Sequence, residues 1–344
     1  MNESWWDRRK FLAAGALGAA GLAAGCSVFD RRGFDSGLGE LYGKFSQEPL
    51  PRLKQGPALA IDEQWVKSLI ADFVKDSPAN SLEKEFAGER IYQEPLIGFA
   101  RGDDALFEQY KTIIGPFHHT PEEVVMWAAH QQMVKAPLAA EVGVISMILP
   151  FNAPIVESNA REKRWCSPRW AQARLLGGLF VKEVEMMVIA ALAERGILAA
   201  APELMPDFTS QNHRESVGWA STWSQRHIAF AAGLGSFGMS DLFISEKGTA
   251  HRCGSVVAAW PLKPDRELPP HYRHHCLYHQ LGECLVCAQR CPAGAITEQG
   301  HDKEKCRKNV VSSWSRNNAR YNINIYGCGL CSSGAPCSQE SPIG

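Results

Sequence analysis

The sequence lacks both a long hydrophobic run and an excess of charge of one sign. No stretch of about 20 apolar residues occurs among its 344 residues, so we expect no membrane-spanning helix in the mature protein. The formal net charge is −1, so nothing suggests the basic face that a nucleic-acid partner would need, and we predict no such partner. The length suggests two domains, or one large domain with a small appendix.

The N-terminus has the pattern of a twin-arginine export signal. Residues 7–12 read Asp-Arg-Arg-Lys-Phe-Leu, and Ala13–Ala24 contains only Ala, Gly and Leu. We therefore predict an exported protein, periplasmic or membrane-associated, with a lipid anchor at Cys26 as one option. The alternative is an exposed helix that follows a chance Arg-Arg pair. Export in the folded state would allow metal loading in the reducing cytoplasm before transport.

Composition and periodicity divide the rest of the chain. Helical spacing of apolar residues predicts helices over 62–76 and 170–195, and Thr120 with Pro121 predicts a helix start. Apolar runs at 142–149 and 255–259 predict buried strands of an α/β core. The predicted organisation is a signal segment (1–26), a linker (27–60), a helical region (61–129), an α/β cofactor domain (130–262) and a cysteine-rich domain (263–344).

Cysteines are concentrated at the C-terminal end. Of 11 cysteines, Cys26, Cys166 and Cys253 are scattered, and the other eight lie within the last domain. The set is Cys276, Cys284, Cys287, Cys291, Cys306, Cys328, Cys331 and Cys337. Its Cys-x2-Cys-x3-Cys-Pro run is typical of bacterial ferredoxins, where the cysteine before proline binds the other cluster. We therefore predict two 4Fe–4S clusters.

The ferredoxin crossing rule divides the eight cysteines into two sets. The first cluster takes Cys276, Cys284, Cys287 and Cys337. The second takes Cys291, Cys306, Cys328 and Cys331. Two zinc sites of four thiolates each are the main alternative, although zinc requires neither Cys-Pro nor the three-residue gap before it.

A glycine-rich segment precedes the cysteines. Gly233, Gly235 and Gly238 form a G-x-G-x-x-G match, but a helical stretch precedes it and a strand follows, the wrong order for a dinucleotide fold. Arg226, this Ala-Gly-Leu-Gly-x-x-Gly segment, Gly254-Ser255-Val256-Val257 and the Cys-Pro module together resemble the corrinoid iron–sulfur reductases. That group includes the reductive dehalogenases and epoxyqueuosine reductase.

The resemblance implies a fold and cofactors. It implies an α/β fold, with a nitroreductase-like corrinoid-binding domain followed by a small ferredoxin-like double-cluster domain. The clusters would pass electrons to a bound corrinoid (cobalamin), which would reduce a small organic substrate. The corrinoid-binding residues implied are Arg226, Gly233, Gly235, Ser236, Gly238 and Gly254. Expected partners are an electron donor, either quinol-linked or a redox protein, and a membrane anchor partner.

The chain departs from the queuosine enzymes at two positions. It has Trp219 where they have an acid and Met239 where they have a lysine, so we do not expect queuosine chemistry. No tyrosine aligns with a dehalogenase proton donor, which leaves the catalytic residues and the substrate unassigned. The alternative function is that of a relative that has kept the clusters as an electron-transfer protein and lost its own substrate chemistry.

Overall fold

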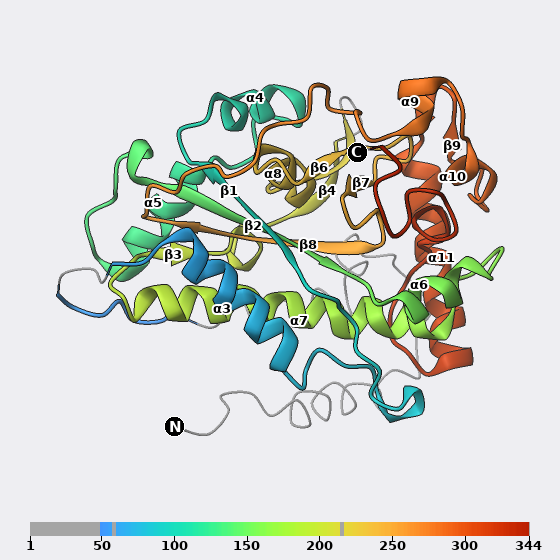
Figure 1. Ribbon diagram of the computed structural model, residues 1–344, viewed down its shortest axis with the longest axis horizontal. Coiled ribbons are helices and arrows are strands. Elements are labelled where there is room, and N and C mark those ends of the chain that lie inside the picture. Colours follow the sequence, from blue (N-terminus) through green and yellow to red (C-terminus); the bar gives the residue numbers. More distant parts are fainter. Residues whose placement is uncertain (1–48, 57–59, 214–216, 344) are drawn as a thin grey trace, which may run out of the picture.

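The computed structural model describes residues 49–56, 60–213 and 217–343 (Figure 1). The predicted signal segment and most of the predicted linker lie outside the described residues. The fold is mixed α/β, as predicted from the sequence. No helix within the described ranges is both long enough and apolar enough to cross a membrane.

A four-stranded antiparallel sheet forms the centre of the fold. Its order is β1 (Leu96–Arg101), β2 (Gly143–Pro150), β8 (His251–Ala258) and β3 (Ala199–Ala200). Alternate residues face opposite sides because side chains alternate along a strand. The register aligns Phe99, Ile145 and Val256 on one face, and Ala100, Val144 and Val257 on the other.

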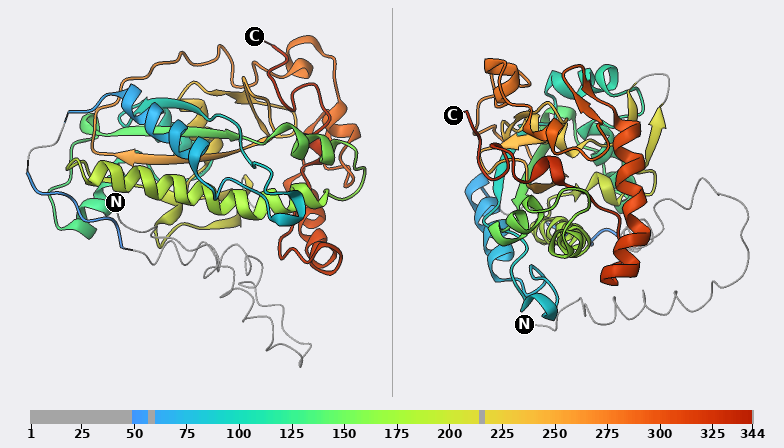
Figure 2. Two further views of the ribbon diagram at one scale, coloured as in Figure 1. Left: turned by 60° about the horizontal axis from the view of Figure 1, so that its bottom comes forward. Right: turned by 90° about the vertical axis from the view of Figure 1, so that its right-hand side faces the viewer.

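Helices cover both faces of this sheet (Figure 2). α3 (Glu63–Asp76) and the long α7 (Pro168–Ala193) pack on the Phe99 side. α4 (Ala105–Ile113), α5 (Pro121–Gln132) and α8 (Gln225–Ala231) pack on the other side. Apolar side chains of the helices and the sheet form one cluster on each face, so the core has three layers: helices, sheet and helices.

The predicted helices and strands are confirmed where the structure describes them. Asp62 caps α3, and Thr120 forms a capping box with Glu123 at the start of α5. The structure differs from the prediction for 61–129, because this region contributes β1. That strand pairs with β2 along its whole length.

Shorter elements connect the core to the C-terminal region. Those within or beside the core are η3 (Lys84–Phe86), η4 (Ala139–Glu141), α6 (Ala153–Ala160), η5 (Pro202–Leu204), the hairpin of β4 (Ser210–His213) and β5 (Gly218–Ser221), and the hairpin of β6 (Gly235–Phe237) and β7 (Phe243–Ser245). The C-terminal elements are α9 (Leu277–Leu281), α10 (Val286–Gln289), β9 (Ile296–Thr297), β10 (Gly300–His301), α11 (Lys303–Tyr321) and η6 (Leu330–Ser332).

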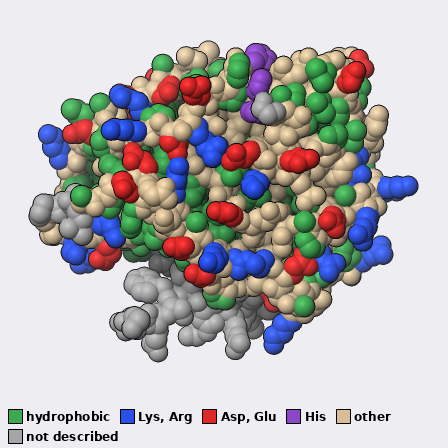
Figure 3. All heavy atoms as spheres, viewed as in Figure 1, with side chains coloured by type: hydrophobic (Ala, Val, Ile, Leu, Met, Phe, Trp, Pro, Cys, Tyr) green, Lys and Arg blue, Asp and Glu red, His purple; other side chains and the backbone are tan. Residues whose placement is uncertain are grey.

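The C-terminal elements gather at one end of the sheet in the views of Figures 1 and 2. Only α11 among them is a long helix, and Asp302 caps its start. On the face shown in Figure 3, acidic and basic side chains are interspersed, as the near-zero net charge suggests.

Candidate functional site

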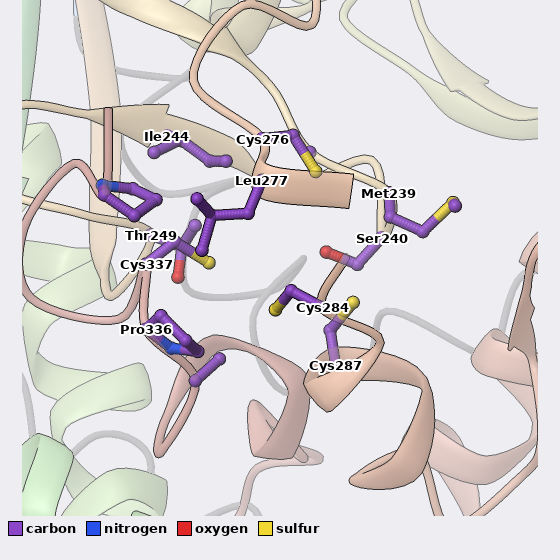
Figure 4. A pocket seen from close by; sticks show the side chains of 13 residues that line it. Met239, Ser240, Ile244, Thr249, Cys276, Leu277, Cys284, Cys287, Pro336 and Cys337 are labelled. Atoms are coloured by element: carbon purple, nitrogen blue, oxygen red, sulfur yellow. The ribbon is translucent and has the colours of Figure 1, made fainter. Parts of the chain in front are cut away.

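Four of the eight C-terminal thiols converge on one small pocket (Figure 4). Cys276 precedes α9, Cys284 and Cys287 lie at α10, and Cys337 comes from the last loop. The pocket has a volume of about 20 Å³. The structure therefore brings together the four cysteines that the crossing rule assigns to the first cluster.

The other four thiols form a second group. The charge of Cys306 on α11 interacts with those of Cys328 and Cys291, and Cys331 interacts with all three. Cys331 also interacts with Cys287 of the first group, so the two groups are neighbours. Cys328 and Cys331 come from the η6 region, far along the chain from Cys291. This set is the one that the crossing rule assigns to the second cluster.

Burial makes these thiols poor acids when no metal is present. It raises the pKa of Cys287 and Cys306 to about 11 and that of Cys337 to about 12, and the neighbouring sulfurs add to each shift. The thiolate is the form that binds metal. A cationic group in each thiol set would therefore offset the cost of burying the thiolates and the repulsion between them. Soft thiolate donors suit iron–sulfur clusters and zinc.

Polar contacts hold the second group in place. The backbone N–H of Ala295 lies 3.3 Å from the Cys291 sulfur, and the Asn309 amide lies 3.8 Å from the Cys328 sulfur. The Arg290 guanidinium donates to the Leu330 carbonyl at 2.8 Å, which links α10 to η6.

Within the described residues, no three His, Cys, Asp or Glu side chains are grouped as a site for a single metal ion.

The glycine-rich segment forms the β6–β7 hairpin against the thiol pocket. Gly235 has φ +152°, and a Cβ there would lie 2.1 Å from the Ile244 carbonyl oxygen. Gly238 lines the thiol pocket, as does Met239, the residue that stands where queuosine enzymes have a lysine. Ser236 accepts a hydrogen bond from the His275 backbone at 2.9 Å, next to Cys276.

A second cavity, of about 200 Å³, lies between α7, α8 and β8. Arg226 lines it, and Gly254 lies beside it, where a Cβ would come within 3.0 Å of the Glu185 carboxylate. Gly233, Gly235, Ser236 and Gly238 do not line this cavity. Of the six residues predicted to bind a corrinoid, the structure therefore groups Arg226 with Gly254 and places Gly238 at the thiol pocket.

A buried ion cluster forms one wall of this second cavity. The Lys182 ammonium donates to Glu185 at 2.8 Å and also contacts Glu203. Burial raises the pKa of the Glu185 carboxyl, although the Lys182 charge opposes the shift. The Ser255 backbone N–H donates to the other Glu185 oxygen at 3.2 Å. Sequence reasoning missed Lys182 and Glu185, although charged residues within the apolar stretch of a long helix were the signal.

Arg226 connects the second cavity to the second thiol group. Its guanidinium donates to the Asp241 carbonyl at 3.0 Å, and its charge lowers the pKa of His251 in the cavity. The same charge acts on Cys306. The Asp241 carboxylate lies 3.2 Å from the His301 imidazole, beside the start of α11. The cavity therefore lies beside the thiols of the second group.

The second cavity is small for a macrocyclic cofactor. Sites for drug-sized ligands occupy roughly 300–1,000 Å³, and a corrinoid is larger than such ligands. The cavity of about 200 Å³ therefore does not enclose a corrinoid, although it has room for a small molecule. The thiol groups, in contrast, supply the donor chemistry that two iron–sulfur clusters need.

Comparisons with known proteins identify relatives of the chain. It is 29% identical over 119 residues to epoxyqueuosine reductase of Staphylococcus aureus, and the aligned segment covers 33% of this chain and 29% of the relative. It is 30% identical over 114 residues to tetrachloroethene reductive dehalogenase of Desulfitobacterium hafniense, which covers 32% of this chain and 20% of the relative. The resemblance seen in the sequence is thereby confirmed.

A solved structure extends the likeness to the fold. A reductive dehalogenase, whose structure suggests a mechanism for B12-dependent dehalogenation, matches 87% of this chain with a TM-score of 0.50 at 16% identity. The match covers 36% of that protein. No protein-family model matches the chain. The chain thus spans less than a third of the two curated relatives and shares its overall fold with a reductive dehalogenase.

Proposed function

We propose that this chain is an iron–sulfur oxidoreductase with two 4Fe–4S clusters in a C-terminal ferredoxin-like domain. The observation that carries the proposal is the arrangement of the eight thiols. Their order in the sequence is interleaved, yet four of them line one pocket and the other four interact with one another, which supports the two sets of the ferredoxin crossing rule. The residues that would hold the clusters are the eight cysteines of these sets.

The neighbouring thiol groups support a direction for electron flow. Cys331 and Cys287 link the two groups, and Arg226 links the second group to the 200 Å³ cavity. Electrons would enter from a donor, quinol-linked or a redox protein, pass through both groups and reach a substrate beside Arg226. The electron-carrier alternative is not favoured, because both sequence relatives are reductases.

The corrinoid is proposed from the resemblance to these relatives. Arg226 and Gly254 are the predicted residues that the structure leaves beside the second cavity, which does not enclose the macrocycle. When bound, a corrinoid would supply the reductive chemistry, and the nitroreductase-like character of the core belongs to the same proposal. Export by the twin-arginine route and a membrane anchor partner are likewise proposed from the sequence.

Metal analysis of anaerobically purified protein tests the proposal. We expect about eight irons and about eight labile sulfides per chain, with the broad visible absorbance of such clusters. Two zinc ions and no labile sulfide would overturn the electron-transfer function. Cobalt is measured in the same sample after reconstitution with cobalamin under reducing conditions. Its absence would remove the corrinoid from the proposal and leave the clusters.

A further inference from the structure

The cavity of about 200 Å³ contains polar atoms that the described protein leaves without partners. The side-chain nitrogens Gln225 Nε2, His251 Nδ1 and Arg252 Nε are buried and make no hydrogen bond to any described residue. All three residues line this cavity. Buried polar groups are nearly always hydrogen-bonded, so three such atoms around one space indicate a polar occupant.

The neighbouring contacts fix what each atom offers. The Gln225 carbonyl oxygen accepts from the Ser255 hydroxyl at 2.8 Å, so the amide nitrogen is the free donor. The His251 Nε2 lies 3.2 Å from the Phe243 carbonyl and must donate to it, so Nδ1 carries the free lone pair. Arg252 Nε is a donor. The occupant must therefore accept two hydrogen bonds and donate one.

The charges around the cavity favour an anion. Arg226 and Arg252 both line it, and the acidic group whose charge acts on Arg226 is Asp241, which also pairs with His301. Glu203 is the acidic residue among the lining side chains, and its charge is opposed by Lys182. Burial and these two arginines hold the pKa of His251 at about 3, so its imidazole is neutral and accepts at Nδ1.

We propose that this cavity binds a small hydroxy carboxylate. Its carboxylate would accept hydrogen bonds from Gln225 and Arg252, and its hydroxyl would donate to His251. A volume of about 200 Å³ equals roughly seven water molecules at about 30 Å³ each, which suits an acid of three or four carbons. The inference rests on the proposed function only in placing this ligand in the cavity assigned to the substrate, and the binding itself needs no metal.

Lactate and propionate form the matched pair that tests this site, since they differ by one hydroxyl group. Calorimetric titration of the purified holoprotein should show millimolar binding of lactate, at least fivefold tighter than that of propionate. Arg252→Gln should weaken both acids at least tenfold, because a charged hydrogen bond is lost. His251→Phe should remove the preference for lactate while propionate still binds.

Arg195→Gln is the control for general loss of positive charge. Arg195 lies over the Trp65 ring at 4.0 Å, outside the cavity lining, so this variant should bind both acids like the wild type. Circular dichroism and urea unfolding show that each variant is folded, and Gln225→Leu gives an independent loss of one donor. Absence of lactate binding to the wild type, or an unchanged affinity in Arg252→Gln, would overturn the proposal. Zinc in place of iron would overturn the proposed function and leave this binding result intact.

Discussion

Replacement of Gly235 by alanine tests how the glycine hairpin supports the thiol pocket. Gly235 has φ +152°, a conformation that favours glycine, and an added Cβ would lie 2.1 Å from the Ile244 carbonyl oxygen. That oxygen belongs to the backbone of β7 and cannot rotate away. Overpacking costs about 1–3 kcal/mol and backbone strain about 1–3 kcal/mol, so we expect a loss of roughly 2–6 kcal/mol in unfolding free energy.

The effect should reach the metal as well as the fold. Ile244 lines the pocket of the first thiol group, so a displaced β7 should disturb that group first. We expect Gly235→Ala to lose about half of the iron and to retain the second cluster. Urea unfolding measures the stability, and iron analysis with resonance spectra measures the clusters.

Alanine substitutions at two further glycines distinguish backbone strain from the steric clash of the added Cβ. Gly88→Ala introduces strain alone, since φ is +66° and nothing lies within 4 Å of the added Cβ, so it should cost about 1 kcal/mol. Gly238→Ala places its Cβ 3.2 Å from the flexible end of the Ile244 side chain and should be mild. If Gly235→Ala is no worse than Gly88→Ala, the hairpin relaxes and the reasoning is wrong.

The remaining predictions concern the clusters, acid stability and export. Cys287→Ala and Cys291→Ala should each lose about half of the iron and different resonance signals, whereas loss of the same signal in both would refute the crossing. Burial lowers the pKa of His118 to about 4, below its unfolded value near 6.5, so the unfolded state takes up the proton first as pH falls. His118 alone should therefore lower the unfolding free energy by about 1.4 kcal/mol per pH unit between pH 6.5 and about 4, and urea titrations at pH 7 and 5 should show a shallower drop in His118→Gln. Replacing Arg8 and Arg9 with lysine should keep the protein in the cytoplasm, which fractionation checks, and an unchanged periplasmic yield would contradict the export prediction.

Local signals in the sequence predicted much of the fold. The apolar spacing of 170–195 corresponds to α7, and the Thr120–Pro121 pair marks the start of α5. β1 was missed because it is short, its neighbours are polar, and its partner β2 lies far along the chain. Pairing between distant strands is a property of the folded chain, which periodicity within one segment does not contain.

The candidate site was predictable in part. Cysteine spacing predicted the thiol groups, because cluster geometry restricts the gaps between ligands. The cavity residues Gln225, His251 and Arg252 were missed, since each is an ordinary polar residue until the fold places them around one space. The position of Gly238 at the thiol pocket was missed for the same reason, because sequence order did not show which element the hairpin packs against.

The interleaving of the two thiol groups determines when, during synthesis of the chain, each group can be completed. A ribosome makes Cys276, Cys284 and Cys287 early in the domain, but their fourth companion is Cys337. The second group is completed by Cys331, also late in the chain. Neither group can close while the nascent chain is still being extended through α11. Under the proposed function, assembly of both clusters would therefore follow translation of α11, and a chain interrupted within α11 would complete neither.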